Sequence, residues 1–381
     1  MASSHRLAGR KAVLSVNASW NVVNFRSGLI RGLRREGLEV VVVAPRDSSS
    51  PALDRLGVSY IPIEMDNQGT SPPRDLRLLR DYWRILGRIR PDVFLGYTAK
   101  PNIYGSLAAR SLGIPVINNV AGLGTAFIKR GWMERVVRRL YTHAFRRSST
   151  IFFQNDTDRE MFVDAGIVAA DRTRLLPGSG IDLSHFRPVP VARGDGAGLR
   201  FLLVARLLWD KGVREFVEAA RLVKRSRPDA QFQLLGFLDV ANRTAIPRAA
   251  VDAWVQEGVV DYLGTADDVR PAMAAADCVV LPSYREGLPR VLLEAGAMAK
   301  PVIATDVPGC HHVVDEGVNG LLCAVRDPVS LSQAMLRMIA LSGRERAAMG
   351  YAGREMVENR FDEKLVVERY LEAIEQAVAG R

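Results

Sequence analysis

The sequence predicts an α/β protein made of two Rossmann-like, doubly wound domains with parallel sheets, and three observations predict this class. The chain has 381 residues, which suits two domains of ordinary size. Short apolar runs alternate with longer amphipathic stretches, as in parallel strands joined by crossover helices. A segment rich in Pro and Gly, residues 187–198, separates two such series and predicts a linker.

Six apolar runs predict the strands of an N-terminal domain over residues 1–186. They are KAVLSV (11–16), LEVVVVA (38–44), VSYIPI (58–63), PDVFLGY (91–97), IPVINNV (114–120) and STIFFQN (149–155). Each run has a helical pattern before or after it. Because ligands bind beyond the carboxyl ends of strands in such sheets, we expect the two domains to face a cleft that holds the ligands.

The strand pattern restarts in a C-terminal domain over residues 199–360. The runs are LRFLLVA (199–205), AQFQLLG (230–236), VVDYLG (259–264), DCVVLPS (277–283), KPVIATD (300–306) and NGLLCAV (319–325). A last helix is predicted within residues 361–381, where apolar side chains recur at helical spacing at Leu365, Val366, Tyr370, Leu371, Ile374 and Val378. The periodicity leaves open which domain this helix packs against.

Composition narrows the class of protein. Hydrophobic residues make up 48% and charged residues 25%, which is typical of a folded, water-soluble chain. We expect neither an export signal nor a membrane-spanning helix, because no apolar run is long enough. Cys278, Cys310 and Cys323 are odd in number and lie in core-like runs, so we expect no disulfide framework or zinc site and a cytoplasmic location. The net charge of +10 predicts an anionic partner.

Two cations follow the first strand of the second domain. In VARLLWDKGV, Arg206 comes just past the strand and Lys211 near the start of the next helix. Arg offers a fork of donors, Lys a mobile charge and the helix end its free N–H groups, a combination that suits a diphosphate. The alternative is that both are ordinary surface charges. Their pairing at one turn favours the diphosphate hypothesis.

Two glutamates flank the turn in YREGLPRVLLEAGAMAKPVIATDVPG. Glu286 is predicted in the loop beyond a buried strand, and Pro289 suits the first position of a helix in which Glu294 lies more than one turn further on. Because a carboxylate repels phosphate, we expect it to meet sugar hydroxyls. The alternatives are local salt bridging for Glu294 and simple solvation for Glu286. A glycosidase pair is also conceivable, but it would leave the nearby cations unexplained.

These motifs resemble the family-four retaining glycosyltransferases with the GT-B fold, over nearly the whole chain. REGLPRVLLEAGAMAKPVIATDVPG resembles the family's E-x7-E signature, and ARLLWDKG resembles its diphosphate site. The resemblance implies that Arg206, Lys211 and Glu286 carry the chemistry and that no cofactor or metal is needed. It also implies donor contacts, to the diphosphate by Arg206 and Lys211, to the sugar by Glu286, Gly287, Leu288 and Pro289, to the ribose by Glu294, and to the base by Leu263 and Gly264.

The first half resembles a narrower subgroup. YTAKPNIYGSLAARSLGIPVINNVAGLGTAF is similar to transferases acting on polyprenyl-diphosphate-linked saccharides, including N-acetylgalactosaminyltransferases that use undecaprenyl-diphosphate-linked bacillosamine. Leu95 and Tyr97 stand where many relatives carry histidine. The expected contacts to an acceptor diphosphate or sugar are Lys100, Asn119, Gly122 and Gly124. A purely structural turn is an equally good interpretation of the glycines.

A basic segment, IKRGWMERVVRRLYTHAFRRSS, mixes cations with aromatic and aliphatic residues. Such a helix can lie on an anionic membrane surface, although a packed helix with a solvated basic face is the plain alternative. Because the inferred acceptor is a lipid, we expect peripheral contact with the inner face of the cell membrane. The candidate residues are Lys129, Arg130, Trp132, Arg135, Arg138 and Arg139.

Together these interpretations predict a transferase that moves a sugar, by preference an N-acetylhexosamine from a UDP donor, to an undecaprenyl-diphosphate-linked saccharide in bacterial glycan or polysaccharide biosynthesis. The expected partners are the nucleotide sugar, the lipid-linked acceptor and the anionic membrane, and no nucleic acid. Two rival hypotheses remain: a sugar-nucleotide epimerase, and a basic protein that binds membrane or nucleic acid on a degenerate transferase scaffold. The second rival would need neither Glu286 nor Lys211.

Overall fold

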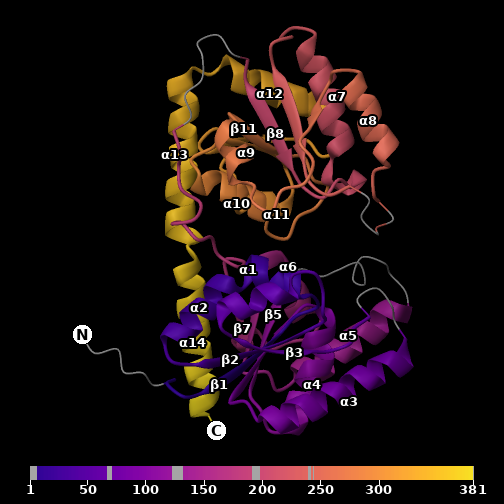
Figure 1. Ribbon diagram of the computed structural model, residues 1–381, viewed down its shortest axis with the longest axis vertical. Helices are drawn as coiled ribbons and strands as arrows, with labels where there is room; N and C mark the ends of the chain where they lie inside the picture. Colours follow the sequence, from indigo (N-terminus) through magenta and orange to yellow (C-terminus); the bar gives the residue numbers. More distant parts are fainter. Residues whose placement is uncertain are drawn as a thin grey trace, which may run out of the picture. The chain divides into compact units, whose positions relative to one another are not determined.

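The computed structural model describes residues 7–66, 71–121, 132–190, 198–238, 242 and 244–380 (Figure 1). The chain forms two compact units, Met1–Gly180 with Glu363–Arg381, and Ile181–Asp362. Of the predicted linker at 187–198, residues 191–197 lie outside the described residues.

The first unit contains a parallel sheet of seven strands in the order β3-β2-β1-β4-β5-β6-β7. The order reverses beside β1, which pairs with β2 on one side and with β4 on the other. This is the doubly wound arrangement, with the carboxyl ends of all strands at one edge. The strands are β1 (Lys11–Ser15), β2 (Glu39–Ala44), β3 (Ser59–Pro62), β4 (Val93–Tyr97), β5 (Val116–Val120), β6 (Thr150–Phe153) and β7 (Thr173–Leu175).

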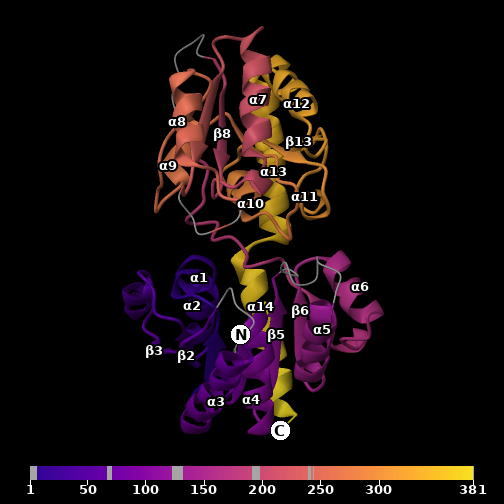
Figure 2. The same cartoon turned by 90° about the vertical axis from the view of Figure 1, so that its right-hand side faces the viewer.

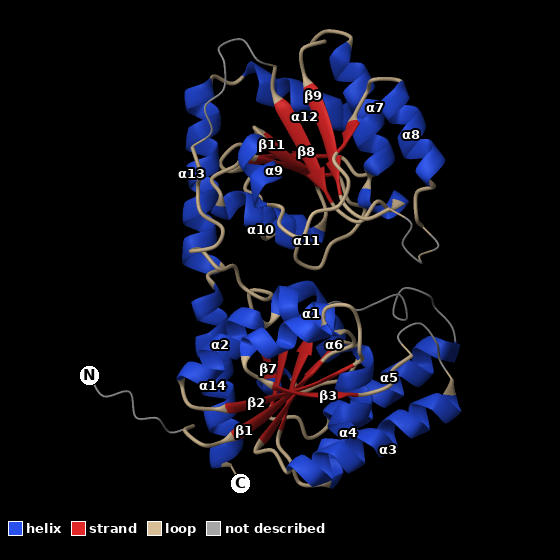
Figure 3. Cartoon of the chain, in the orientation of Figure 1, coloured by secondary structure: helices blue, strands red, loops and turns tan. Residues whose placement is uncertain are grey.

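Helices cover both faces of this sheet (Figure 3). One face packs on α3 (Pro72–Ile89) and α4 (Ser106–Ser111), and further along on α5 (Trp132–Phe145) and α6 (Asp156–Asp164). The other face packs on α2 (Ser27–Arg35), which follows α1 (Ser19–Phe25), and on the C-terminal helix α14 (Glu363–Ala379).

Helix α14 answers the question that periodicity left open. It lies beside α2 and along β5 in the first unit (Figures 1 and 2). Its apolar side chains Val366, Tyr370 and Ile374 are buried in the core of that unit. The end of the chain thus completes the sheet's helical cover on one face.

The second unit repeats the arrangement with six parallel strands in the order β10-β9-β8-β11-β12-β13. One face packs on α7, α8 and α12, and the other on α9, α10, α11 and α13. The strands are β8 (Arg200–Val204), β9 (Gln231–Leu235), β10 (Asp261–Tyr262), β11 (Cys278–Leu281), β12 (Val302–Thr305) and β13 (Gly320–Cys323). The helices are α7 (Val213–Lys224), α8 (Arg248–Gln256), α9 (Arg270–Ala275), α10 (Arg290–Ala297), α11 (Pro308–His311), α12 (Pro328–Ala340) and α13 (Gly343–Arg360).

The two parallel-sheet domains confirm the predicted fold class, and all twelve predicted strands are present. Two local predictions were wrong. Strand β7 was missed, because its three residues, Thr173–Leu175, form an edge strand too short for an apolar run. Pro289 precedes α10 as its N-cap and is not its first residue. Both errors lie at element ends, where the sequence signal is weakest.

Candidate active site

Lys211 and Glu286 form an ion pair beyond the carboxyl ends of β8 and β11. The Nζ of Lys211 lies 2.6 Å from Oε1 of Glu286, and the two side chains are 21% and 12% exposed. Lys211 ends a short 3-10 helix, Trp209–Lys211, that follows β8. Because the strands are parallel and adjacent, residues that follow them meet at the same edge of the sheet.

Two glycines allow the backbone around Lys211 and Glu286 to pack closely. Gly212 has a φ of 70°, and a Cβ there would lie 1.9 Å from the carbonyl oxygen of Pro282. A Cβ on Gly309, in the first turn of α11, would lie 2.3 Å from the carbonyl oxygen of Glu286. Both positions therefore need glycine for close backbone approach. The loop that carries Glu286 is held between the turn after β8 and the start of α11.

The loop is also tied by hydrogen bonds. The Tyr284 backbone N–H donates to the Asp210 carbonyl at 3.0 Å. The Thr305 hydroxyl, at the end of β12, donates a short hydrogen bond to the Ser283 carbonyl. Three strand ends thus fix the position of Glu286.

Other predicted donor contacts lie at the same edge of the second sheet. Arg206 is exposed directly after β8, and no ion pair of its side chain occurs within the described part of the chain. Leu263 and Gly264 follow β10; Leu263 is 42% exposed, and the Gly264 carbonyl accepts from the Gly236 N–H at 2.9 Å. Gly287 and Leu288 are partly buried beside Glu286, and Pro289 is buried.

Glu294 lies in the second turn of α10. Its Oε1 accepts from Nε of Arg290 at 2.7 Å, so the local salt bridge considered as an alternative is present in this structure. Burial raises the pKa of the Glu294 carboxyl, and Arg290 opposes that shift. The other carboxylate oxygen of Glu294 can accept a hydrogen bond from a ligand hydroxyl.

Three residues beside this site were missed by sequence reasoning. The Tyr284 hydroxyl donates to Oε1 of Glu215 at 2.8 Å, and the guanidinium of Arg326 lies 4.6 Å from the centre of the Tyr284 ring. Burial, and then the bond to Glu215, raise the pKa of Tyr284 to about 12. Oε2 of Glu215 is buried without a hydrogen-bond partner. The only feature of the sequence that could have identified one of them is the position of Tyr284, two residues before Glu286.

The predicted acceptor residues in the first unit have protein partners. Nζ of Lys100 lies 2.5 Å from Oδ1 of Asp75, and both side chains are 14% exposed. Asn119 is fully buried, and its Nδ2 donates to the Tyr370 hydroxyl at 3.1 Å. The two glycines of the same prediction, Gly122 and Gly124, lie outside the described residues.

The predicted membrane segment is described only in part. Lys129 and Arg130 lie outside the described residues, as does the side chain of Trp132 at the start of α5. Arg135 and Arg139 are exposed on α5. Arg138 is partly buried and donates from Nη2 to the Ala165 carbonyl at 3.1 Å, a structural contact. Searched over the described residues, the chain has no helix with the length and apolarity to span a bilayer.

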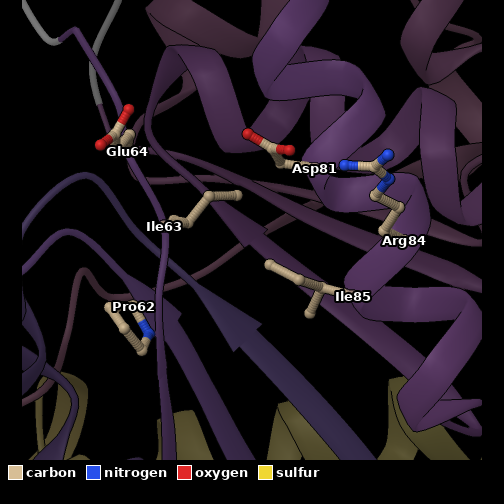
Figure 4. A pocket seen from close by; sticks show the side chains of 6 residues that line it. All are labelled: Pro62, Ile63, Glu64, Asp81, Arg84 and Ile85. Atoms are coloured by element: carbon tan, nitrogen blue, oxygen red, sulfur yellow. The ribbon is translucent and has the colours of Figure 1, made fainter.

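Further surface and core features lie away from these strand ends. Pro62, Ile63 and Ile85 line a hollow of about 310 Å³ beside β3 and α3, with Glu64, Asp81 and Arg84 adding charge (Figure 4). A second hollow, of about 320 Å³, is lined by Arg31, Arg34 and Arg35. Cys278, Cys310 and Cys323 are buried, free thiols. Among the described residues, no three His, Cys, Asp or Glu side chains gather as metal ligands would.

Two family models match the chain. Residues 23–178 match the description "Glycosyl transferase 4-like domain", and residues 198–340 match "Glycosyl transferases group 1". Each match falls on one sheet and its helices. The second includes Lys211, Glu286 and Glu294.

Two curated relatives and one solved structure are similar over most of the chain. The N,N'-diacetylbacillosaminyl-diphospho-undecaprenol alpha-1,3-N-acetylgalactosaminyltransferase of Campylobacter jejuni is 27% identical, covering 95% of this chain and 97% of the relative. The UDP-Gal:alpha-D-GlcNAc-diphosphoundecaprenol alpha-1,3-galactosyltransferase of Escherichia coli is 26% identical, covering 81% and 85%. The crystal structure of Anabaena HepE in complex with UDP has a TM-score of 0.77 at 19% identity, covering 95% and 98%.

Proposed function

Because this chain belongs to the glycosyltransferases with the GT-B fold, we propose that it transfers an N-acetylhexosamine from a UDP-sugar to a saccharide on undecaprenyl diphosphate. The acceptor class comes from the two full-length relatives, whose names both specify a saccharide on diphosphoundecaprenol. The observation that carries the chemistry is the Lys211–Glu286 pair at two adjacent strand ends.

In this proposal the pair divides between two parts of the donor. Lys211 and the exposed Arg206 bind the diphosphate, because a flexible ammonium and a guanidinium fork suit phosphate oxygens. Glu286 accepts hydrogen bonds from hydroxyls of the transferred sugar. In this structure the two charges satisfy each other at 2.6 Å. The pair keeps both side chains at the strand ends before the donor arrives, which limits the ordering needed on binding.

The proposed reaction retains the configuration of the anomeric carbon. The bond between that carbon and the UDP phosphate oxygen breaks, and the acceptor hydroxyl forms its new bond on the same face. An oxygen of the departing phosphate takes the hydroxyl proton. Lys211 and Arg206 stabilise the charge that grows on the diphosphate, a form of electrostatic catalysis that needs no metal ion.

Glu294 and the residues after β10 complete the proposed donor site. Glu294 holds the ribose through the carboxylate oxygen that Arg290 does not occupy. The exposed side chain of Leu263 offers an apolar surface to the uracil ring. Gly287, Leu288 and Pro289 place backbone groups beside the sugar.

The proposed acceptor site lies in the first unit, at Asn119 and at the Lys100–Asp75 pair, where Lys100 can exchange its carboxylate for a phosphate. Arg135 and Arg139, exposed on α5, are proposed to contact anionic lipid headgroups on the cytoplasmic side of the membrane. In the same proposal, residues 1–186 form the acceptor domain and 199–360 the donor domain.

The test is turnover of a panel of UDP- and GDP-sugars by the purified chain, with and without undecaprenyl-diphosphate saccharides. We expect one UDP-sugar to be consumed only when acceptor is present. Lys211→Ala and Glu286→Ala should each reduce kcat/KM by roughly 10²- to 10³-fold, the size seen when one transition-state contact is removed. Lys224→Ala, at the far end of α7, should leave it unchanged. Consumption without any acceptor, or full activity of both site variants, would refute the proposal.

A further inference from the structure

Arg26 is a buried cation that forms no ion pair with a carboxylate in the part of the chain that the structure describes. It lies between α1 and α2 and is only 5% exposed. Its guanidinium lies 4.4 Å from the centre of the Tyr97 ring, and Nη1 donates to the Phe25 carbonyl at 3.5 Å, the outer limit of a hydrogen bond. Nε is buried and has no hydrogen-bond partner among the described residues. Within the described residues, no acidic side chain pairs with Arg26.

The groups around Arg26 also have unused hydrogen-bonding capacity. Tyr97 is the last residue of β4 and Asn119 lies near the end of β5; both are fully buried. Among the described residues, Oδ1 of Asn119 has no hydrogen-bond partner and the Tyr97 hydroxyl has none at hydrogen-bond distance, although Tyr370 lies close enough to add to the rise in the pKa of Tyr97 that burial causes. Tyr370 of α14 joins them: its ring lies 6.1 Å from that of Tyr97, and its hydroxyl accepts from Nδ2 of Asn119. Arg26, Tyr97, Asn119 and Tyr370 therefore form one contiguous polar cluster, which we call the Arg26 cluster.

The cluster offers donors to an anion. Burial raises the pKa of Tyr97 and of Tyr370, and Arg26 opposes the shift in both cases. Both hydroxyls thus keep their protons at neutral pH and can donate. Helix α2, nine residues long, begins directly after Arg26 without a side-chain cap, but the carboxylate of Glu363 lies against Gly28 in its first turn, so the donors that the cluster offers are those of Arg26 and of the two hydroxyls.

Stacking on Tyr97 does not account for this arrangement by itself. A guanidinium carries five N–H donors, and burying it without an anionic partner has a large desolvation cost. Stacking satisfies the face of the guanidinium but none of the N–H groups at its edge. Lys211 and Lys100, two largely buried cations near strand ends, are by contrast each paired with a carboxylate, Glu286 and Asp75.

We propose that the Arg26 cluster binds a phosphate group of the lipid-linked acceptor at the carboxyl end of β4 and β5. The identity of the ligand rests on the proposed function, but the preference for a phosphate-like anion rests on the cluster alone. The phosphate oxygens replace the long contact of Arg26 to the Phe25 carbonyl and accept from Nε and from the Tyr97 hydroxyl. Asn119 Oδ1 accepts from a hydroxyl of the first sugar.

The test measures binding and needs no turnover. The full chain carrying Lys211→Ala and Arg206→Ala, which together remove both cations of the proposed diphosphate site for the sugar nucleotide, is titrated calorimetrically with geranyl diphosphate, inorganic pyrophosphate and geraniol. We expect both diphosphates to bind and geraniol not to bind. Adding Arg26→Gln should weaken both diphosphates at least tenfold. Arg35→Gln, which removes an exposed charge from the same helix, should change binding less than twofold.

Other outcomes decide between sources of the anion. If pyrophosphate binds through Arg26 but geranyl diphosphate does not, the cluster takes a small free anion and the assignment to a lipid acceptor is overturned. If Arg26→Gln binds both as tightly as its background, the proposal fails altogether. Arg26→Lys keeps the charge but lacks the Nε–H from which the phosphate accepts, so it should bind both diphosphates several-fold more weakly than the arginine form. This variant keeps the test decisive should Arg26→Gln fold poorly, because unchanged binding by Arg26→Lys would contradict the proposed contact.

Turnover adds an independent measurement. In the otherwise native chain, Arg26→Gln should raise the KM for the lipid-linked acceptor at least tenfold and leave the KM for the sugar nucleotide unchanged. If no substrate pair is ever turned over but the diphosphates bind through Arg26, the proposed function fails and the anion site remains. A rise in both KM values together would mark Arg26 as merely structural and contradict its role in acceptor binding.

Discussion

The two sheets differ in how a largely buried cation near their strand ends is paired. Beyond the second sheet, Lys211 is neutralised by Glu286 at 2.6 Å, and both side chains are half-buried. Beyond the first sheet, Arg26 is more deeply buried, stacks on Tyr97 and has no acidic partner among the described residues. Each unit thus holds a lysine–carboxylate pair at a strand end, Lys211–Glu286 in the second and Lys100–Asp75 in the first, and the first unit adds a buried cation that has no such partner among the described residues.

The difference indicates which kind of ligand each proposed site can bind. A donor that carries both a diphosphate and a sugar can replace each member of a pair with its own partner, so a neutral pair suits it. An uncompensated cation suits a ligand with a single anionic group. A buried charge without a partner is a more specific sign of a functional site than a buried ion pair. Ion pairs with a purely structural role also shift the pKa values of the groups around them.

The first prediction breaks the neutral pair. Lys211→Met should lower the free energy of unfolding by about 1 to 3 kcal/mol, because it leaves the carboxylate of Glu286 largely desolvated and without the hydrogen bond from Lys211. Chemical denaturation of the ligand-free chain measures this. Lys211→Met with Glu286→Gln should recover most of the loss, since the double variant buries no lone charge. A single variant as stable as the native chain would mean that the pair contributes nothing before the donor binds.

The second sheet could be predicted largely from the sequence. Its strands are apolar runs, and Lys211 and Glu286 both follow such runs, so the parallel topology places them at one edge. The salt bridge between them was not predicted. It depends on the approach of Gly212 to Pro282 and of Gly309 to Glu286, which no spacing in the sequence specifies.

The first sheet shows where sequence reasoning ends. Asn119 was predicted as an acceptor contact within the stretch that resembles the transferase subgroup, but Arg26 was not singled out. Arg26 reaches the end of β4 only because α1 ends at Phe25 and α2 restarts at once, and Tyr370 arrives from helix α14, 251 residues after Asn119. Tertiary packing of this kind leaves no periodic signal in the sequence.

The next prediction perturbs the second sheet's site without changing charge. Gly309→Ala places a Cβ 2.3 Å from the Glu286 carbonyl oxygen, so the loop must shift and carry Glu286 away from Lys211. We expect the KM for the sugar nucleotide to rise about tenfold, a loss of about 1.4 kcal/mol. Gly87→Ala in α3, where the added Cβ has room, should be neutral or slightly stabilising. Equal effects of the two substitutions would show that the close approach is unimportant.

A pH measurement tests the surroundings of the pair. Burial, and then the negative charge of Glu286, raise the pKa of the Cys310 thiol from 9.0 to about 12. The folded state therefore keeps this proton longer than the unfolded state. The stabilisation is present below pH 9 and is lost as the pH rises from 9 towards 12, reaching about 1.4 kcal/mol of loss at pH 10.

Unfolding by urea at pH 7.5 and at pH 10 measures the difference. Cys310→Ala should weaken the decline between the two pH values by about that amount, although it lowers stability at both. The other buried thiols and tyrosines also lower the free energy of unfolding as the pH rises. They are present in both proteins, so their contributions cancel in the comparison. An unchanged decline in Cys310→Ala would place the proton release elsewhere.

The last prediction has the smallest expected effect and is the most direct test of the difference between the Lys211–Glu286 pair and Arg26. Arg26→Met removes a buried charge that has no partner to be left behind, so the loss of its stacking on Tyr97, on the order of 1 kcal/mol, is offset by relief of desolvation. We expect the free energy of unfolding of the ligand-free chain to change by less than about 1 kcal/mol, in contrast to Lys211→Met. Denaturation repeated with millimolar pyrophosphate should stabilise the native chain more than the variant, because only the native cluster gains from the anion. If Arg26→Met destabilises the ligand-free chain as strongly as Lys211→Met does, Arg26 must already be compensated by the fold, and the contrast between the two strand ends disappears.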